Sequence, residues 1–248
     1  MKRLLFFSSL LLACSLATAQ EIRVAFGTEM REVVEALARE YANQTGGKFV
    51  LVPANLDDIV KQLKSEAACD VWLTKELGQL NNLYLTGQVP EKPRVFAKSN
   101  MVQVAGKGPG PTQSNDLQNL TRSEVKKIVV MAPAGSAHGK ETMRMLHNAG
   151  IYDQVKGKLL YATNQSEMQY YLNTRAAEVG ISPAPQAKAQ RGSQWQEINQ
   201  KLYRPTEYGV ACFKKNMVAP TTAAQDFARF LFSAKAKLIL RNHGYEPI

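Results

Sequence analysis

Three histidines are the residues of this chain best suited to acid-base or metal chemistry, because the ordinary pKa of histidine lies close to neutral pH. His147 falls near the end of a predicted helix and His243 just past another, where a cation complements the helix dipole. We interpret both as surface residues. His138 instead stands between a predicted strand and a predicted helix, where ligand contacts collect. His138 is either an ordinary loop residue, a ligand contact, or the base of an exported hydrolase.

The segment around His138 comes close to a phosphate-binding loop, since a strand, a Gly-rich turn, Lys140 and a helix follow one another. The pattern is incomplete: Ala134 stands where its first Gly is required, and Glu141 stands where Ser or Thr would hold magnesium. No G-x-S-x-G motif supplies a nucleophile elsewhere. The segment is predicted to be a helix start with exposed amides, and neither enzymatic activity nor a cofactor is expected.

Acidic residues stand at the starts of two predicted helices, Glu29 in one and Asp57 and Asp58 in the other. The helix dipole favours carboxylates there, so capping and solubility explain them. A sharper hypothesis pairs Glu29 with His138 as ligands of a divalent metal or of an amine-bearing solute.

Apolar residues alternate between strand and helix periods along the chain. Predicted strands cover 21–26, 49–52, 71–73, 101–105, 128–131, 179–181 and 210–213, and predicted helices cover about 29–41, 57–67, 140–148, 167–174, 221–232 and 234–242. The expected N-caps are Thr28, Asn55 or Asp57, Thr221 and Ser233, although the last two helices also fit one continuous helix. This alternation predicts an α/β protein whose mainly parallel sheets are flanked by helices and bind ligands beyond the carboxyl ends of their strands.

The first nineteen residues have the order of an export signal: basic Lys2 and Arg3, an apolar run over 4–12, and the cleavage site Ala17-Thr18-Ala19. Their removal lowers the formal net charge from +10 to +8. The alternative is a lipoprotein site, in which Cys14 is acylated and anchors the chain. The protein is therefore expected in the periplasm.

The composition predicts a soluble chain with a full core, since 45% of the residues are hydrophobic. No run of Lys and Arg is longer than two, which argues against nucleic-acid binding. Cys69 and Cys212 each fall in an apolar, strand-like segment, so a disulfide and two buried thiols remain equally open.

The order of elements carries a family resemblance. The chain resembles the molybdate-binding proteins of ABC importers in the layout of five segments. These are 21–63, Cys69-Asp70-Val71-Trp72, the turn and helix of 137–150, Val179-Gly180-Ile181 and the closing helices of 227–244. The resemblance implies a type II periplasmic binding protein with two α/β lobes joined by crossing strands. It places lobe 1 at 20–98 with the C-terminal helices 221–248, and lobe 2, with the hinge-crossing strands, at 99–220. It also implies an ABC permease as partner, and we expect a monomer.

The resemblance further implies where the solute binds. The family's two hydroxyl positions fall on Glu29 and Leu56, and the donors one residue earlier, Thr28 and Asn55, are possible replacements. Its two main-chain amide positions fall on His138 and Gln165, and its tyrosine position falls on Pro183, which has no hydroxyl. The expected ligand-binding residues are therefore Thr28, Glu29, Asn55, His138 and Gln165. The resemblance to molybdate- and tungstate-binding proteins implies a small oxyanion as solute, although the ligand contacts are altered, and the alternative is a divalent metal or another small solute.

Overall fold

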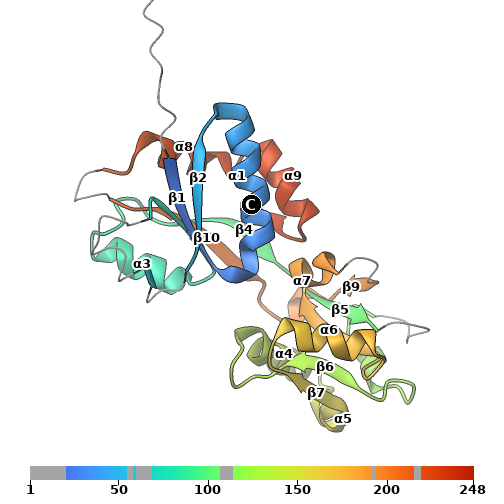
Figure 1. Cartoon of the computed structure of the whole chain (residues 1–248). Coiled ribbons are helices and arrows are strands. Elements are labelled where there is room, and N and C mark those ends of the chain that lie inside the picture. Colours follow the sequence, from blue (N-terminus) through green and yellow to red (C-terminus); the bar gives the residue numbers. More distant parts are fainter. Residues whose placement is uncertain (1–20, 55–57, 60–68, 107–113, 191–193, 215–218) are drawn as a thin grey trace, which may run out of the picture.

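The computed structural model describes residues 21–54, 58–59, 69–106, 114–190, 194–214 and 219–248. These residues form two sheets, each flanked by helices, which give the molecule an upper and a lower lobe in Figure 1. We call the lobe of the six-stranded sheet the first lobe and the lobe of the five-stranded sheet the second lobe. The predicted two-lobed α/β architecture is confirmed. The prediction of mainly parallel sheets is wrong, because each sheet combines parallel and antiparallel strand pairs.

The first sheet has the strand order β11-β4-β10-β3-β1-β2. β1 lies parallel to β2 and β3, whereas β10 lies antiparallel to β3 and β4. The strands are β1 (Glu21–Phe26), β2 (Lys48–Pro53), β3 (Val71–Thr74), β4 (Arg94–Ser99), β10 (Thr206–Cys212) and β11 (Glu246–Pro247). The parallel strands β1, β2 and β3 therefore end at one edge of the sheet.

The second sheet has the strand order β7-β6-β8-β5-β9. β6 lies parallel to β7 and β8, and β5 lies antiparallel to β8 and β9. The strands are β5 (Met101–Ala105), β6 (Ile128–Met131), β7 (Leu159–Ala162), β8 (Val179–Pro183) and β9 (Trp195–Glu197).

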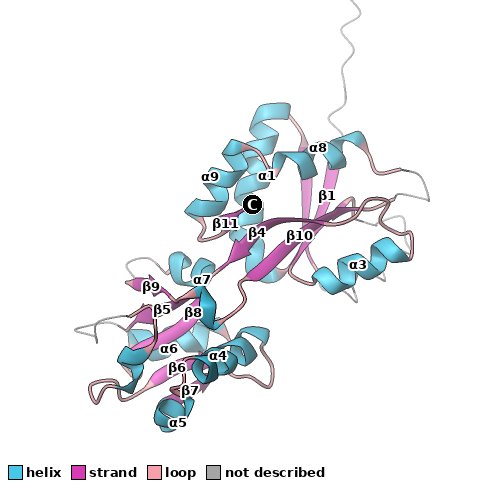
Figure 2. Ribbon diagram, turned by 180° about the vertical axis from the view of Figure 1, so that it is seen from behind, coloured by secondary structure: helices cyan, strands magenta, loops and turns pink. Residues whose placement is uncertain are grey.

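Helices cover both faces of each sheet (Figures 1 and 2). The first lobe carries η1 (Thr28–Met30), α1 (Arg31–Thr45), α3 (Leu77–Leu85), α8 (Thr222–Phe230) and α9 (Ala234–Asn242). The rest of the chain carries η2 (Gln118–Thr121), α4 (Ala137–Asn148), α5 (Tyr152–Val155), η3 (Lys156–Lys158), α6 (Gln165–Asn173), α7 (Ala184–Ala189) and η4 (Gln200–Leu202). Among the described residues, we find no helix that is long and apolar enough to cross a membrane.

Alternate residues of the strands build two apolar clusters in each lobe. In β1, Val24 and Phe26 pack with α1, α8 and α9, while Ala25 packs on the other face with α3. In β6, Val130 packs towards α4 and α5 and Val129 towards α6 and α7. Because both faces are covered, consecutive apolar residues occur in strands such as β6, whose sequence is IVVM.

Most predicted elements within the described residues are confirmed, and so are the caps of the two C-terminal helices. The predicted helix over 57–67 lies outside the described residues except for 58–59. The Thr221 hydroxyl accepts from the Ala224 amide and the Ser233 hydroxyl from the Ala236 amide, each at 3.2 Å, so α8 and α9 are separate helices. Thr28 is not a side-chain cap, because a 3₁₀ turn precedes α1 and shifts its start to Arg31. The sequence patterns missed β4, β7, β9, α3, α5 and α7, which are short or only partly apolar.

Two chain segments cross between the lobes, as the resemblance implied. β4 continues into β5 through Asn100, and the chain returns to the first sheet through Arg204 and Pro205 into β10 (Figure 2). The C-terminal region also touches the second lobe, since Lys188 Nζ donates to the Arg241 carbonyl at 2.9 Å. The predicted domain boundaries stay a prediction; they count β10 with the second lobe, whereas β10 hydrogen-bonds into the first sheet.

Both cysteines in the described part of the chain are free thiols. Cys69 belongs to the apolar cluster beside α3, and Cys212 packs on the opposite face of the sheet. Burial raises the pKa of each thiol to about 12. Of the two possibilities left open by the sequence, the structure supports two buried thiols.

Candidate functional site

Two helix starts meet at one edge of the second sheet. β6 leads into α4 and β7 leads into α6, and because β6 and β7 are parallel neighbours, both helices begin at the same edge. Ser136 Oγ accepts from the Gly139 amide at 3.2 Å, and Asn164 Oδ1 accepts from the Glu167 amide at 2.9 Å. These caps satisfy the third amide of each helix. The preceding amides remain available to an anion, which the positive end of a helix dipole also attracts.

α4 begins so close to the sheet because Gly139 has no side chain. A Cβ atom on Gly139 would stand 2.4 Å from the Met131 carbonyl oxygen at the end of β6, which no real contact allows. The glycine therefore lets the first turn of α4 lie against the strand end.

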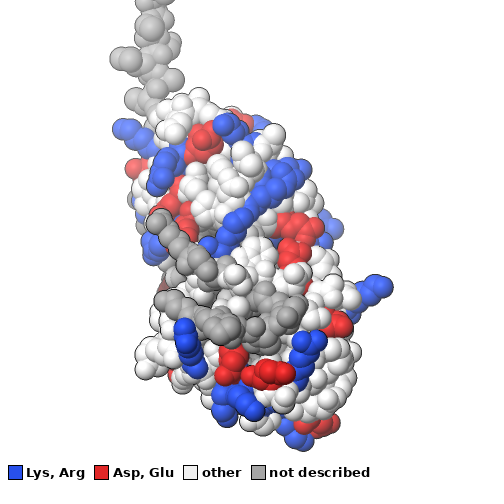
Figure 3. Space-filling model, turned by 90° about the vertical axis from the view of Figure 1, so that its right-hand side faces the viewer, with Lys and Arg blue, Asp and Glu red and all other residues white. Residues whose placement is uncertain are grey.

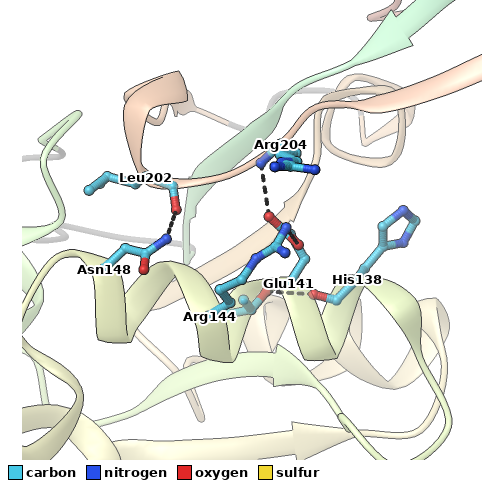
Figure 4. Close-up of polar contacts among 7 residues, drawn as sticks. His138, Glu141, Arg144, Asn148, Leu202 and Arg204 are labelled. Atoms are coloured by element: carbon cyan, nitrogen blue, oxygen red, sulfur yellow. Dashed lines mark hydrogen bonds and ion pairs between the residues drawn. The ribbon is translucent and has the colours of Figure 1, made fainter.

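His138 occupies that first turn, and Figure 4 shows its ring projecting away from α4. Its Nε2 atom is buried and has no hydrogen-bond partner among the described residues. Burial, and after it the charge of Lys75, lower the pKa of His138 to about 4, against the opposing effects of Glu29 and Glu141. The imidazole is therefore neutral at pH 7 and offers one donor and one acceptor nitrogen.

Glu29 and Lys75 bring opposite charges from the first lobe towards His138. The parallel strands β1 and β3 pair Phe26 with Leu73, so the residues that follow them are neighbours. Lys75 Nζ lies 3.3 Å from Glu29 Oε1, and the two side chains are 28% and 21% exposed. Lys75 lines the same cavity as His138, and both charges of the ion pair act on the pKa of His138.

Tyr208 has a buried hydroxyl close enough to Glu29 for the carboxylate to act on its pKa. It lies on β10, is 0% exposed, and its hydroxyl makes no hydrogen bond of normal geometry in the described part of the chain. Burial and the charge of Glu29 raise the pKa of Tyr208 well above its ordinary value, and the nearby Ser99 hydroxyl opposes this shift. Tyr208 therefore stays protonated and can donate a hydrogen bond.

A cavity of about 430 Å³ opens beside His138 and lies between the lobes. Its walls come from the start of α3, the first turns of α4 and the returning chain segment: Lys75 to Gln79, Ala137, His138, Glu141, Arg144 and Arg204 to Glu207. The Glu141 carboxylate accepts from the Arg204 amide at 2.9 Å and pairs with Arg144, as Figure 4 shows. This contact ties the crossing segment to α4.

A second cavity, of about 570 Å³, lies where α7 and the end of α9 face η1. Glu29 and Thr28 line it, together with Gln186, whose Oε1 atom is buried without a hydrogen-bond partner among the described residues. Glu29 therefore borders this cavity while its partner Lys75 borders the other.

Comparisons with known proteins agree with this arrangement. Residues 22–246 match the family model of the bacterial extracellular solute-binding proteins. The chain belongs to this family. Its resemblance to molybdate-binding proteins is thus confirmed at the level of the family and of solute binding.

Three proteins are similar to this solute-binding protein in sequence or fold over most of its length. The chain is 23% identical to the molybdate-binding protein ModA of Azotobacter vinelandii over 240 residues, which cover 95% of this chain and 93% of the relative. The substrate-binding domain of a putative molybdenum ABC transporter from Clostridium difficile has a TM-score of 0.81 at 20% identity, covering 92% and 99%. L-phospholactate-bound PEB3, a protein of Campylobacter jejuni, has a TM-score of 0.67 at 16% identity, covering 91% and 99%. At these identities the solved structures confirm the fold.

The structure of the solute-binding protein brings some of the predicted site residues together. Glu29 pairs with Lys75, which lines the same cavity as His138. Gln165 is the first residue of α6, with Nε2 buried and without a partner among the described residues. Thr28 is exposed at the start of η1, and Asn55 lies outside the described residues together with Leu56 and Asp57. Their roles as ligand contacts stay predictions.

Sequence patterns missed Lys75 and Tyr208. Lys75 lies two residues after the predicted strand 71–73 of a parallel sheet, and that position was itself a usable signal. Tyr208 gave no such signal, because it lies on the antiparallel strand β10. The pairing of β10 with β3, the neighbour of β1, brings it near Glu29.

Proposed function

We propose that this protein captures a small oxyanion between its two lobes and delivers it to an ABC permease in the membrane. The observation that carries the proposal is a set of three buried donors. His138 Nε2 and Gln165 Nε2 have no partner among the described residues, and the Tyr208 hydroxyl lies near the Ser99 hydroxyl without a hydrogen bond of normal geometry. A buried polar group left unpaired costs about 1–3 kcal/mol. A bound oxyanion would accept from these groups and from the amides of the first turns of α4 and α6, and Lys75 would balance part of its charge.

The names of the relatives support an anionic solute. The Azotobacter relative is named for molybdate, and the Campylobacter protein is titled with bound L-phospholactate. The family's tyrosine position falls on Pro183, and we propose that the Tyr208 hydroxyl replaces that contact from β10.

Capture needs no chemistry. The two crossing segments act as the hinge, the lobes close over the anion, and the closed form is recognised by the permease. A hydrolase is the rival, but the free Nε2 atom of His138 lacks the bond to a nucleophile that a catalytic base requires.

A divalent metal between Glu29 and His138 is the second alternative. The Lys75 ammonium group already lies against the Glu29 carboxylate, and a metal would have to displace it. The described residues hold no group of three or more His, Cys, Asp or Glu side chains placed to bind a metal ion. Both facts favour an oxyanion over a divalent metal as the ligand.

Thermal unfolding of the mature protein tests the proposal with molybdate, tungstate, sulfate and phosphate, each against chloride at equal ionic strength, and with divalent metal chlorides. At a hundredfold excess over its Kd, a ligand stabilises the folded protein by about 2.7 kcal/mol, which is roughly 5–10 °C for a protein of this size. We expect such a shift with at least one oxyanion. A shift with a metal but with none of the oxyanions would instead support the pair of Glu29 and His138.

Two lysine variants form a matched pair for this experiment. Lys75→Met removes the cation of the site and is expected to abolish the oxyanion shift. Lys48→Met makes the same change on an exposed residue at the amino end of β2, away from the carboxyl ends of the strands, and is expected to keep it. Equal shifts in both variants would contradict the proposed site.

We also propose that the signal peptide is cleaved after Ala19 on export, which frees the protein in the periplasm. Mass spectrometry of the protein from its native host decides between a new N-terminus at Gln20 and an acylated Cys14. A lipid-modified Cys14 would show a membrane-anchored protein instead.

A further inference from the structure

Glu29 holds a carboxylate at the edge of the proposed oxyanion site, where an acid is unexpected. The carboxylate folds back over Gly27: a Cβ atom there would stand 2.7 Å from Glu29 Oε2 and 2.8 Å from Oε1. A residue larger than glycine at position 27 would therefore require the Glu29 carboxylate to move.

Lys75 is the cation that pairs with Glu29 in the described part of the chain, although Arg31 and Lys188 also line the cavity that Glu29 borders. Lys75 Nζ lies 3.3 Å from Oε1, whereas the other groups that feel the charge of Glu29 are uncharged at neutral pH: His138, Tyr208 and Tyr245. The ion pair thus has no net charge. The excess attraction for an anion comes from neutral donors and from helix dipoles.

An ionised carboxylate can only accept hydrogen bonds. A fully ionised oxyanion, such as sulfate or molybdate at pH 7, also offers only acceptor oxygens, so Glu29 repels it and gains no hydrogen bond. Hydrogen phosphate has the same tetrahedral shape but keeps a proton, which it can donate to Glu29. The remaining phosphate oxygens still accept from Lys75, His138 and the helix amides.

Building on the proposed oxyanion site, we infer that Glu29 determines its specificity and selects oxyanions that keep a proton at neutral pH, with hydrogen phosphate as the simplest. Fully ionised oxyanions of similar size are rejected. In this arrangement Lys75 supplies affinity for every anion, while Glu29 discriminates among them.

Isothermal titration calorimetry with inorganic phosphate, sulfate and molybdate at pH 7 tests the inference on the mature protein. We expect phosphate to bind at least tenfold more tightly than the other two. Glu29→Gln keeps the side-chain shape, removes the charge and adds a donor, so it is expected to reduce this preference at least tenfold. Glu35→Gln is the matched control, because Glu35 pairs with Arg31 on α1 at 3.6 Å and faces no proposed donor.

Each result decides between the two proposals. Binding of sulfate or molybdate as tight as that of phosphate overturns the inference and leaves the oxyanion site standing. An unchanged preference in Glu29→Gln overturns the role of Glu29. Binding of none of the three anions, in a protein whose thermal unfolding remains cooperative, overturns both proposals. Lys75→Met separates the two roles, since it is expected to weaken all anions by a similar factor.

Discussion

Replacing Tyr208 by Phe removes one hydroxyl from the proposed site and leaves the rest of the side chain unchanged. The Tyr208 ring packs edge-on against Tyr245 with centroids 5.2 Å apart, a contact that Phe keeps. The lost hydroxyl has no hydrogen bond of normal geometry with the described residues. The stability of the ligand-free protein should therefore stay the same or rise, by up to about 1–2 kcal/mol.

The same change should weaken ligand binding. A hydrogen bond to a charged partner contributes about 1.5–3 kcal/mol, which corresponds to a roughly 10-fold to 150-fold increase in Kd. The variant is thus expected to lose affinity without losing stability, a combination that a purely structural tyrosine would not give. Calorimetric titration with the anion identified for the wild type gives the Kd, and urea unfolding of the ligand-free protein gives the free energy of unfolding.

Tyr203 offers a matched control. Its hydroxyl accepts a hydrogen bond from the Met101 amide at 3.0 Å, and the side chain is 5% exposed. Tyr203→Phe leaves a buried amide without a partner, so it should destabilise the protein by about 1–3 kcal/mol and change the Kd little. If Tyr208→Phe lost as much stability as Tyr203→Phe while its Kd stayed unchanged, the hydroxyl would be a structural partner of Ser99, and our reasoning would be refuted.

Three further predictions concern the rest of the structure. The pKa of His138 is about 4 in the folded protein and near its ordinary value of 6.5 after unfolding, so the unfolded chain binds more protons between these values. Stability should therefore fall by about 3 kcal/mol as the pH drops from 6.5 to 4, and His138→Gln should flatten this part of a urea-unfolding pH profile. Gly139→Ala should cost about 1–3 kcal/mol, because its methyl group meets the carbonyl at the end of β6, whereas Gly135→Ala meets nothing within 4 Å and should be neutral in the same assay. Cys69 and Cys212 should be alkylated without reductant only after denaturation, and a mass 2 Da below the reduced value would reveal a disulfide and contradict the two separate thiols.

The amino-acid sequence alone determined the features that depend on neighbouring residues. The alternation of strands and helices follows from apolar periodicity, and the start of α9 at Ser233 follows from a hydroxyl that reaches an amide three residues away. The position of His138 between a strand and a helix was predicted for the same reason, since a strand, a polar turn and an amphipathic helix form one continuous pattern. The position of Gln165 was implied by the family resemblance instead. The strand β4 escaped prediction, because its six residues contain only two fully buried apolar side chains, Phe96 and Ala97.

Only the tertiary structure decided which side chains share the site. Glu29 meets Lys75 because β3 lies beside β1, and Tyr208 comes near Glu29 because β10 returns to the first lobe between β3 and β4. Thr28 could not be placed correctly from sequence, since the 3₁₀ turn before α1 leaves its side chain exposed. Strand order and pairing arise from contacts between residues far apart along the chain, and local patterns contain no information about them. The elements of this protein follow from its sequence, whereas its binding site follows from the way its two sheets are assembled.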